Sequence, residues 1–166
     1  MLLSDRSIRS ALAIHPLIEP YPSNPRIQPA SVDLLLGNEF EIDGWKNHTL
    51  QDGGIFFLEP GEFALAHTIE MISLPADIAA RVEGKSTHGR RGLLIHATAG
   101  FIDPGFRGQV TLELANLGQS SIGVQVGEPI AQICFYQLTT PADRPYGHDG
   151  LGSKYQDQTG ATSARH

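Results

Sequence analysis

The chain has 166 residues, of which 40% are hydrophobic and 18% are charged, and this length and composition suit one domain with a core of its own. Its formal net charge of −6 argues against nucleic-acid binding, which requires a broad positive surface, but a small anionic ligand needs only a few local cations. The N-terminal "MLLSDRSIRS" carries charge early and lacks an apolar run long enough for a signal peptide or membrane span. We therefore expect no membrane association and a soluble protein of the reducing cytoplasm.

The chain begins with the pattern of a short helix. Ser4 can cap it, Asp5 suits the positive end of the helix dipole, and Ile8 and Leu12 give an apolar stripe. Pro16 should stop the helix, and the proline-rich "HPLIEPYPSNPRIQP" predicts extended, irregular backbone.

After this segment the apolar residues change to a period of two. The runs separated by turn residues are "SVDLLLG", "EFEI", "GIFFLEP", "EFALAHTIEMISL", "IAARVEG", "GLLIHATA", "QVTLELANLG", "IGVQV" and "PIAQICFYQL". Many short strands of this kind predict an all-β sandwich or a barrel of the jelly-roll type. Trp45 and Lys46 in "DGWKNHT" are predicted to form a turn between strands, without chemistry.

The stretch "EGKSTHGRRG" ends like a phosphate-binding P-loop but does not have its spacing. A P-loop needs a glycine where this chain has Ala79, inside an apparent strand. The stretch still gathers a lysine, two arginines and two hydroxyls between glycines, which suits an anion-binding turn.

Glu113 is the candidate for acid–base chemistry. In "VTLEL", strict alternation puts Val110, Leu112 and Leu114 on one face of a strand and Thr111 and Glu113 on the other. Glu113 then faces either solvent or a pocket, where desolvation would raise the pKa of its carboxyl toward neutrality.

Asp103 and His96 lie near this strand in the sequence. Asp103 precedes a Pro-Gly turn, so it either caps the turn or binds a ligand. For His96, between "LLI" and "ATA", a buried and hydrogen-bonded ring is favoured over a catalytic one.

The single cysteine, Cys134, excludes an internal disulfide and is expected to be a small core residue. The histidines and the cysteine show no zinc-ligand spacing, and the signature of the zinc nucleobase deaminases is absent. We therefore expect no protein-bound zinc.

The tail from Pro141 onward is polar and rich in glycine. It is either disordered or a lid that becomes ordered on a ligand, since Tyr146, Lys154, Tyr155 and Gln158 are ligand-type side chains among flexible glycines.

Taken together, these segments resemble the dCTP deaminases of the trimeric dUTPase superfamily. The resemblance runs nearly end to end, through "SDRSIRSAL", "QPASVDLLLGNEF", "EGKSTHGRRGLLIHATAGFIDPGFRGQVTLELAN" and "RPYGHDGLGSKYQDQTG". It implies one domain over residues 1–166, an all-β distorted jelly roll or β-barrel with a short N-terminal helix, and a C-terminal lid over residues 141–166. It also implies a homotrimer with sites between subunits and Mg²⁺ bound through the nucleotide triphosphate.

The resemblance also assigns roles to residues. Glu113 matches the catalytic glutamate. The substrate-binding residues would be Lys85, Ser86, Thr87, His88, Gly89 and Arg90 in the basic turn, Asp103 at the 3′-hydroxyl, Thr111, Leu112 and Gln132 at the base, and Tyr146, Lys154 and Gln158 in the tail.

The pair Gly100 and Phe101 resembles the branch of the family that converts dCTP to dUMP, ammonia and pyrophosphate. Three alternatives remain: a deaminase that releases dUTP, a dUTP pyrophosphatase, and a nucleotide-sensing module without turnover. The chain departs from the family pattern at Thr87, where a serine is usual, at His88, where an apolar residue is usual, and in a short region between Phe40 and Gly61.

Overall fold

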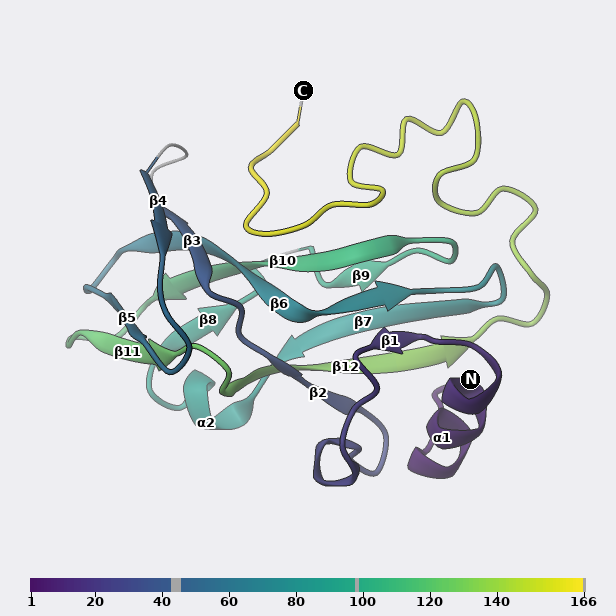
Figure 1. Ribbon diagram of the computed structural model, residues 1–166, viewed down its shortest axis with the longest axis horizontal. Coiled ribbons are helices and arrows are strands. Elements are labelled where there is room, and N and C mark those ends of the chain that lie inside the picture. Colours follow the sequence, from purple (N-terminus) through teal and green to yellow (C-terminus); the bar gives the residue numbers. More distant parts are fainter. Residues whose placement is uncertain (43–45, 98, 166) are drawn as a thin grey trace.

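The computed structural model describes residues 1–42, 46–97 and 99–165 (Figure 1). Helix α1 spans Asp5–Ile14 and buries Ile8 and Leu12, so the predicted stripe is confirmed. The helix ends before Pro16, whose ring cannot continue it. Ser4 occupies the capping position, but its hydroxyl makes no capping hydrogen bond.

Every apolar run identified in the sequence contains a strand. The remaining elements, in chain order, are β1 (Ile18–Glu19), η1 (Asn24–Arg26), β2 (Val32–Leu35), β3 (Glu39–Ile42), β4 (Lys46–Thr49), β5 (Ile55–Leu58), β6 (Phe63–Ser73), β7 (Ile78–Gly84), α2 (Ser86–Gly89), β8 (Leu93–Ile95), β9 (Phe101–Ile102), β10 (Arg107–Asn116), β11 (Ile122–Gln125) and β12 (Pro129–Gln137). The all-β class with one short N-terminal helix is confirmed.

The predicted turn at Lys46 is wrong. Lys46 begins β4, which pairs antiparallel with β3 from Ile42↔Lys46 to Glu39↔Thr49. The segment "KNHT" has no apolar alternation, and its pairing rests on backbone hydrogen bonds that the pattern of side chains does not reveal. Trp45 lies outside the described residues.

Two antiparallel sheets and a two-stranded ribbon form the body of the molecule. One sheet has the order β4-β3-β6-β10-β8, with β1 also paired to β6; the other has the order β2-β12-β7-β9; and β5 pairs with β11. The C-terminal segment runs over β10, as Figure 1 shows. In this order β10 lies between β6 and the edge strand β8.

Strand β10 has one face in the core and one face outside it. Leu112 and Leu114 are fully buried, while Thr111 and Glu113 are half-buried on the opposite face. The predicted alternation is therefore confirmed, and it anchors Glu113 on a strand whose back is packed.

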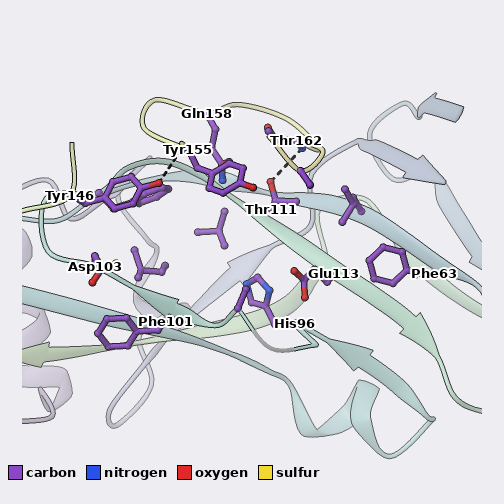
Figure 2. A pocket seen from close by; sticks show the side chains of 16 residues that line it. Phe63, His96, Phe101, Asp103, Thr111, Glu113, Tyr146, Tyr155, Gln158 and Thr162 are labelled. Atoms are coloured by element: carbon purple, nitrogen blue, oxygen red, sulfur yellow. Dashed lines mark hydrogen bonds between the residues drawn. The ribbon is translucent and has the colours of Figure 1, made fainter. Parts of the chain in front are cut away.

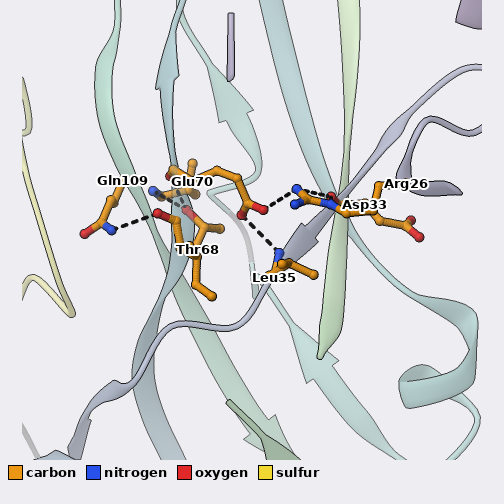
Figure 3. A network of polar contacts seen from close by, with 8 residues as sticks. Arg26, Asp33, Leu35, Thr68, Glu70 and Gln109 are labelled. Atoms are coloured by element: carbon orange, nitrogen blue, oxygen red, sulfur yellow. Dashed lines mark hydrogen bonds and ion pairs between the residues drawn. The ribbon is translucent and has the colours of Figure 1, made fainter. Parts of the chain in front are cut away.

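The pairing of β6 with β10 is interrupted at one point. Between Gln109↔Met71 and Thr111↔His67, β6 has residues 68–70 opposite Val110 alone. The Thr68 hydroxyl fills this gap: it accepts the Val110 N–H at 3.0 Å and donates to the Glu70 carbonyl at 2.9 Å (Figure 3). The irregularity thus leaves no unsatisfied amide at Val110.

Glu70, in the same bulge, ties β6 to the N-terminal part of the chain. Its carboxylate is fully buried, pairs with Arg26 and accepts the Leu35 N–H at 3.0 Å (Figure 3). Burial raises the pKa of Glu70, and the Arg26 guanidinium opposes this shift. Removing one partner would leave a buried charge alone, which is strongly destabilising.

Cys134 is half-buried rather than part of the core, because it lies on the face of β12 opposite Ile133 and Phe135. Partial burial raises the pKa of its thiol. None of the described helices combines the length and apolar character needed to cross a bilayer.

Candidate active site

A pocket of about 490 Å³ lies between β10, the segment from His96 to Phe106, and the C-terminal segment (Figure 2). Its volume falls in the range of small-molecule sites. The lining residues from the sequence-based predictions are Phe101, Asp103, Thr111, Glu113, Tyr146 and Gln158. Residues more than forty positions apart in the chain therefore converge on one cavity.

Glu113 points into this pocket and is held in place. Its Oε2 atom accepts the Ala97 N–H at 3.1 Å, and its carbonyl accepts the His96 N–H at 3.1 Å. A carboxylate fixed on a packed strand, with one oxygen bonded to backbone, has its orientation set before any ligand enters. Glu113 therefore lines a pocket rather than facing bulk solvent, and its catalytic role stays a prediction.

His96 lines the same pocket, and the prediction of a hydrogen-bonded ring is wrong. Both of its ring nitrogens are buried and lack a hydrogen-bond partner among the described residues. Burial lowers the pKa of His96, and Glu113 acts in the opposite direction. The ring is therefore neutral near pH 7 and can both donate and accept a hydrogen bond beside Glu113.

The residue pattern of the sequence did not place His96 in the pocket, and the reason lies in the local backbone. The residue follows β8 with a φ of +63°, so its side chain leaves the alternation of the strand. A positive φ at a residue other than glycine is uncommon and marks a site of local strain. No residue pattern in "LLIHATA" indicates this conformation.

The opposite wall of the pocket comes from the loop after β9. Asp103 follows Phe101 and Ile102, and its carbonyl accepts the Phe106 N–H at 3.2 Å in the predicted turn. Its exposed side chain also lines the pocket, so the residue belongs both to the turn and to the pocket wall. The Phe101 side chain is 59% exposed and also lines the pocket.

Gly100, the other half of the predicted dUMP-forming pair, has no room for a side chain. Its carbonyl accepts the Val82 N–H at 2.8 Å, and a Cβ atom there would lie 2.6 Å from the Val82 carbonyl oxygen. The glycine therefore permits the close approach of the segment before β9 to β7.

The C-terminal segment covers the pocket from above β10. The Tyr146 ring packs edge-on against Phe106 with centroids 5.7 Å apart, and its hydroxyl accepts the Tyr155 N–H at 2.9 Å. Gln158 is buried, and its side-chain amide donates to the Gln109 carbonyl at 2.8 Å. Lys154 is exposed and does not line the pocket. Tyr155, one of the ligand-type side chains noted in the tail, also lines the pocket, as does Thr162, which the sequence did not single out.

The basic turn lies apart from this pocket. Among the described residues that line the pocket there is no lysine or arginine. Ser86, Thr87 and Arg90 are exposed on and just after α2, where their side chains are open to a ligand. His88 is buried under the turn, with Nε2 3.3 Å from the Pro129 carbonyl, so its side chain faces away from any ligand on the outer side.

Lys85 and Gln132 belong to a polar cluster behind this turn. The Lys85 ammonium lies 2.6 Å from the Asp33 carboxylate, and Asp33 pairs in register with Gln132. The Gln132 side chain accepts the Ser31 hydroxyl at 3.1 Å. Leu112, also predicted at the base, has its side chain in the core, so only its backbone can reach a ligand.

Fold and pocket together define an all-β, jelly-roll-like protein with a pocket of small-molecule size that Glu113 and His96 line. A family model described as dCTP deaminase-like matches residues 2–138. The chain belongs to the dCTP deaminase-like family.

Curated relatives agree with this assignment. The "dCTP deaminase, dUMP-forming" of Dictyoglomus turgidum is 44% identical over 187 residues, covering 99% of this chain and 94% of the relative. The protein of the same name from Mycolicibacterium paratuberculosis is 46% identical over 182 residues, covering 99% and 95%.

Solved structures show the likeness of fold. The 2′-deoxycytidine 5′-triphosphate deaminase of Agrobacterium tumefaciens superposes with a TM-score of 0.69 at 24% identity, covering 81% of this chain and 47% of that chain. A mutant dUTPase from phage phi11 of S. aureus, described with a structural Mg(II) ion, gives a TM-score of 0.53 at 17% identity, covering 73% and 85%.

Proposed function

We propose that this protein hydrolyses dCTP to dUTP and ammonia, and then hydrolyses dUTP to dUMP and pyrophosphate. The observation that carries the proposal is Glu113, held by the Ala97 N–H inside a pocket on a chain 44% identical to a dUMP-forming dCTP deaminase. Each step consumes one water molecule.

The deamination follows from the position of Glu113. Its carboxylate takes a proton from a water molecule that attacks C4 of the cytosine ring, and then delivers a proton to the departing amine. A single carboxylate can perform both transfers because they occur in sequence and at adjacent atoms. The neutral His96 ring beside it offers a donor and an acceptor for the water or the base.

The remaining pocket residues orient the nucleotide. Asp103 accepts the deoxyribose 3′-hydroxyl, and the Thr111 hydroxyl with the Leu112 backbone borders the base. Tyr146 and Gln158 close the pocket from the tail, and Lys154 is assigned to the triphosphate. Excluding water in this way strengthens each polar contact inside the pocket.

A homotrimer explains why one chain carries two separate halves of a site. The pocket residues described here include no cation, although a triphosphate requires several. Lys85, Ser86, Thr87 and Arg90 supply such groups on a different part of the chain. The basic turn of a second copy therefore completes the pocket of the first.

Magnesium enters with the substrate. Among residues 1–42, 46–97 and 99–165 no three His, Cys, Asp or Glu side chains gather as a metal-binding group. The described residues therefore offer no protein cage for the ion. Mg²⁺ carried by the phosphate oxygens, as is usual for this ion, needs none. When bound, the ion neutralises charge on the triphosphate.

A product assay on dCTP with Mg²⁺ tests the proposal. We expect ammonia, pyrophosphate and dUMP in equal amounts. Accumulation of dUTP with ammonia would show that the second hydrolysis does not occur. Absence of ammonia would remove the deaminase and leave a pyrophosphatase or a binding module, which dUTP hydrolysis and nucleotide-binding measurements distinguish.

A further inference from the structure

A second carboxylate lies on the same sheet face as Glu113. The strand registers pair Glu41 of β3 with Leu65 of β6, and Leu65 with Glu113 of β10. Leu65 and Glu113 line the pocket, and Glu41 is next to them in the row. Since paired residues lie about 5 Å apart, the two carboxylates stand on backbone positions about 10 Å apart.

Glu41 is bound by the C-terminal segment rather than by solvent. It is only 6% exposed, and its Oε2 atom accepts the Ser163 hydroxyl at 2.5 Å. Its Oε1 atom is buried and has no hydrogen-bond partner among the described residues. The Ser163 hydroxyl therefore ties the tail to a buried carboxylate of β3, and we call this placement of the tail its closed arrangement.

Gln109 makes a second set of contacts with the same segment. Its side-chain amide donates to the Ile69 carbonyl at 3.1 Å and accepts the Gly160 N–H at 2.7 Å. Its backbone N–H donates to the Gln158 carbonyl at 3.0 Å. Gln109 therefore connects the bulge of β6 to the tail.

Gly160 fits this arrangement for two reasons. Its φ is +68°, a conformation that favours glycine. The Glu39 carboxylate also occupies the space that a Cβ atom would need.

Thr162 lies between Gly160 and Ser163 in the tail. It donates its N–H to the Thr111 hydroxyl at 3.4 Å, which places the segment directly over the pocket (Figure 2).

We propose that Glu41 and Gln109 are positioning residues that hold residues 158–164 over the pocket; the catalytic consequence of this rests on the proposed function. Neither side chain lines the pocket. Both act through the tail, whose own residues Gln158, Thr162 and Ala164 do line it. The closed arrangement is thus fixed by groups built into the sheet that carries Glu113.

Amide hydrogen exchange on the full-length, nucleotide-free protein tests this directly. In Glu41→Ala and in Ser163→Ala, we expect exchange of the amides of residues 158–164 to accelerate about tenfold, the effect of losing one hydrogen bond to a charged group. The double variant should be no faster than either single variant, because both remove the same contact. Glu41→Gln keeps a carbonyl acceptor and should restore slow exchange.

Glu41 is buried in the sheet, so Glu41→Ala can also disturb folding. Ser163→Ala tests the same contact without this problem, because it removes one half-buried hydroxyl and leaves the core intact. Ser120→Ala, in the turn between β10 and β11, is the matched control and should exchange like the wild type. Unchanged exchange in Ser163→Ala and Glu41→Ala, or additive effects in the double variant, would overturn the proposal.

Gln109 is tested by two variants, one of which keeps half of its amide and one of which keeps neither half. Gln109→Glu retains the acceptor for Gly160 and loses the donor to Ile69, while Gln109→Leu loses both. Exchange should be fastest in Gln109→Leu and intermediate in Gln109→Glu. Equal exchange in both variants and the wild type would remove Gln109 from the proposal.

Kinetics on dCTP provide a separate result. A loosened tail should raise KM about tenfold in Glu41→Ala, with partial rescue in Glu41→Gln. If wild-type protein releases no ammonia, the proposed function fails, but the exchange results still decide whether these residues hold the tail.

Discussion

The Oε2 atom of Glu113 accepts a hydrogen bond from the backbone N–H of Ala97 at 3.1 Å. Because Ala97 follows His96, this bond joins the carboxylate of β10 to the segment that also carries the neutral imidazole. The second Glu113 oxygen stays available for a water molecule in the pocket. This relationship makes Glu113 the first residue to test.

Glu113→Gln should abolish most deamination. The amide cannot accept a proton from water, and the loss of a general acid–base group typically lowers the rate about a hundred- to ten-thousandfold. Ammonia release from dCTP measures the effect. Glu19→Gln, an exposed carboxylate on β1, is the control and should leave the rate unchanged. If Glu113→Gln keeps ammonia release but loses pyrophosphate release, the assigned role is wrong.

Arg90→Ala should raise KM for dCTP about ten- to a hundredfold, because a guanidinium gives two charge-assisted hydrogen bonds to phosphate. The adjacent Arg91 is a matched control: its guanidinium donates to the Gly123 carbonyl at 3.4 Å, away from α2. Steady-state ammonia release gives both constants. Equal KM values in the two variants would place the triphosphate elsewhere.

Ending the chain at Thr140 should spare folding and lower turnover about a hundredfold. The sheets and their core are complete before this point, and the family match ends at residue 138. The pocket would lose Tyr146, Tyr155 and Gln158, so the substrate would be less well positioned. Circular dichroism and turnover measure the two effects, and full activity of the shortened chain would refute a lid.

Stability should fall in acid through His96. Burial lowers the pKa of this ring in the folded state. Below about pH 6.5 the unfolded chain binds a proton at residue 96 that the folded chain does not bind, so acid favours unfolding. The stabilising contribution is thus present above that pH and is lost as the pH falls.

His96→Asn tests this linkage, because asparagine tolerates a positive φ. The decrease in unfolding free energy between roughly pH 7.5 and roughly pH 5.5 should be smaller in His96→Asn than in the wild type, as urea titrations measure. The exposed His15→Asn should keep the wild-type decrease. The same decrease in all three proteins would contradict the assignment.

Gly100→Ala should lower the free energy of unfolding by about 1–3 kcal/mol, the usual cost of overpacking. The added methyl group would press on the Val82 carbonyl and separate β9 from β7. Gly89→Ala meets nothing within 4 Å and should stay within about 0.5 kcal/mol of the wild type. Denaturant unfolding of both variants gives the comparison.

The sequence determined most strands and the direction in which Glu113 points. Alternation is a local property of extended backbone, so "VTLEL" specified that Leu112 faces the core and Glu113 the other side. Turn residues likewise marked the strand ends, whereas β4 was missed because "KNHT" carries no apolar pattern. Resemblance to the family added the roles of residues, which the spacing of residue types alone left open.

The tertiary structure decided which residues meet. It turned His96 into the pocket through a positive φ, and it placed the basic turn apart from Glu113. It also set the polar tail on Gln109 and Glu41, where composition alone had favoured disorder. These features depend on contacts between segments far apart in the chain, and such contacts leave no periodic pattern in the residues that make them.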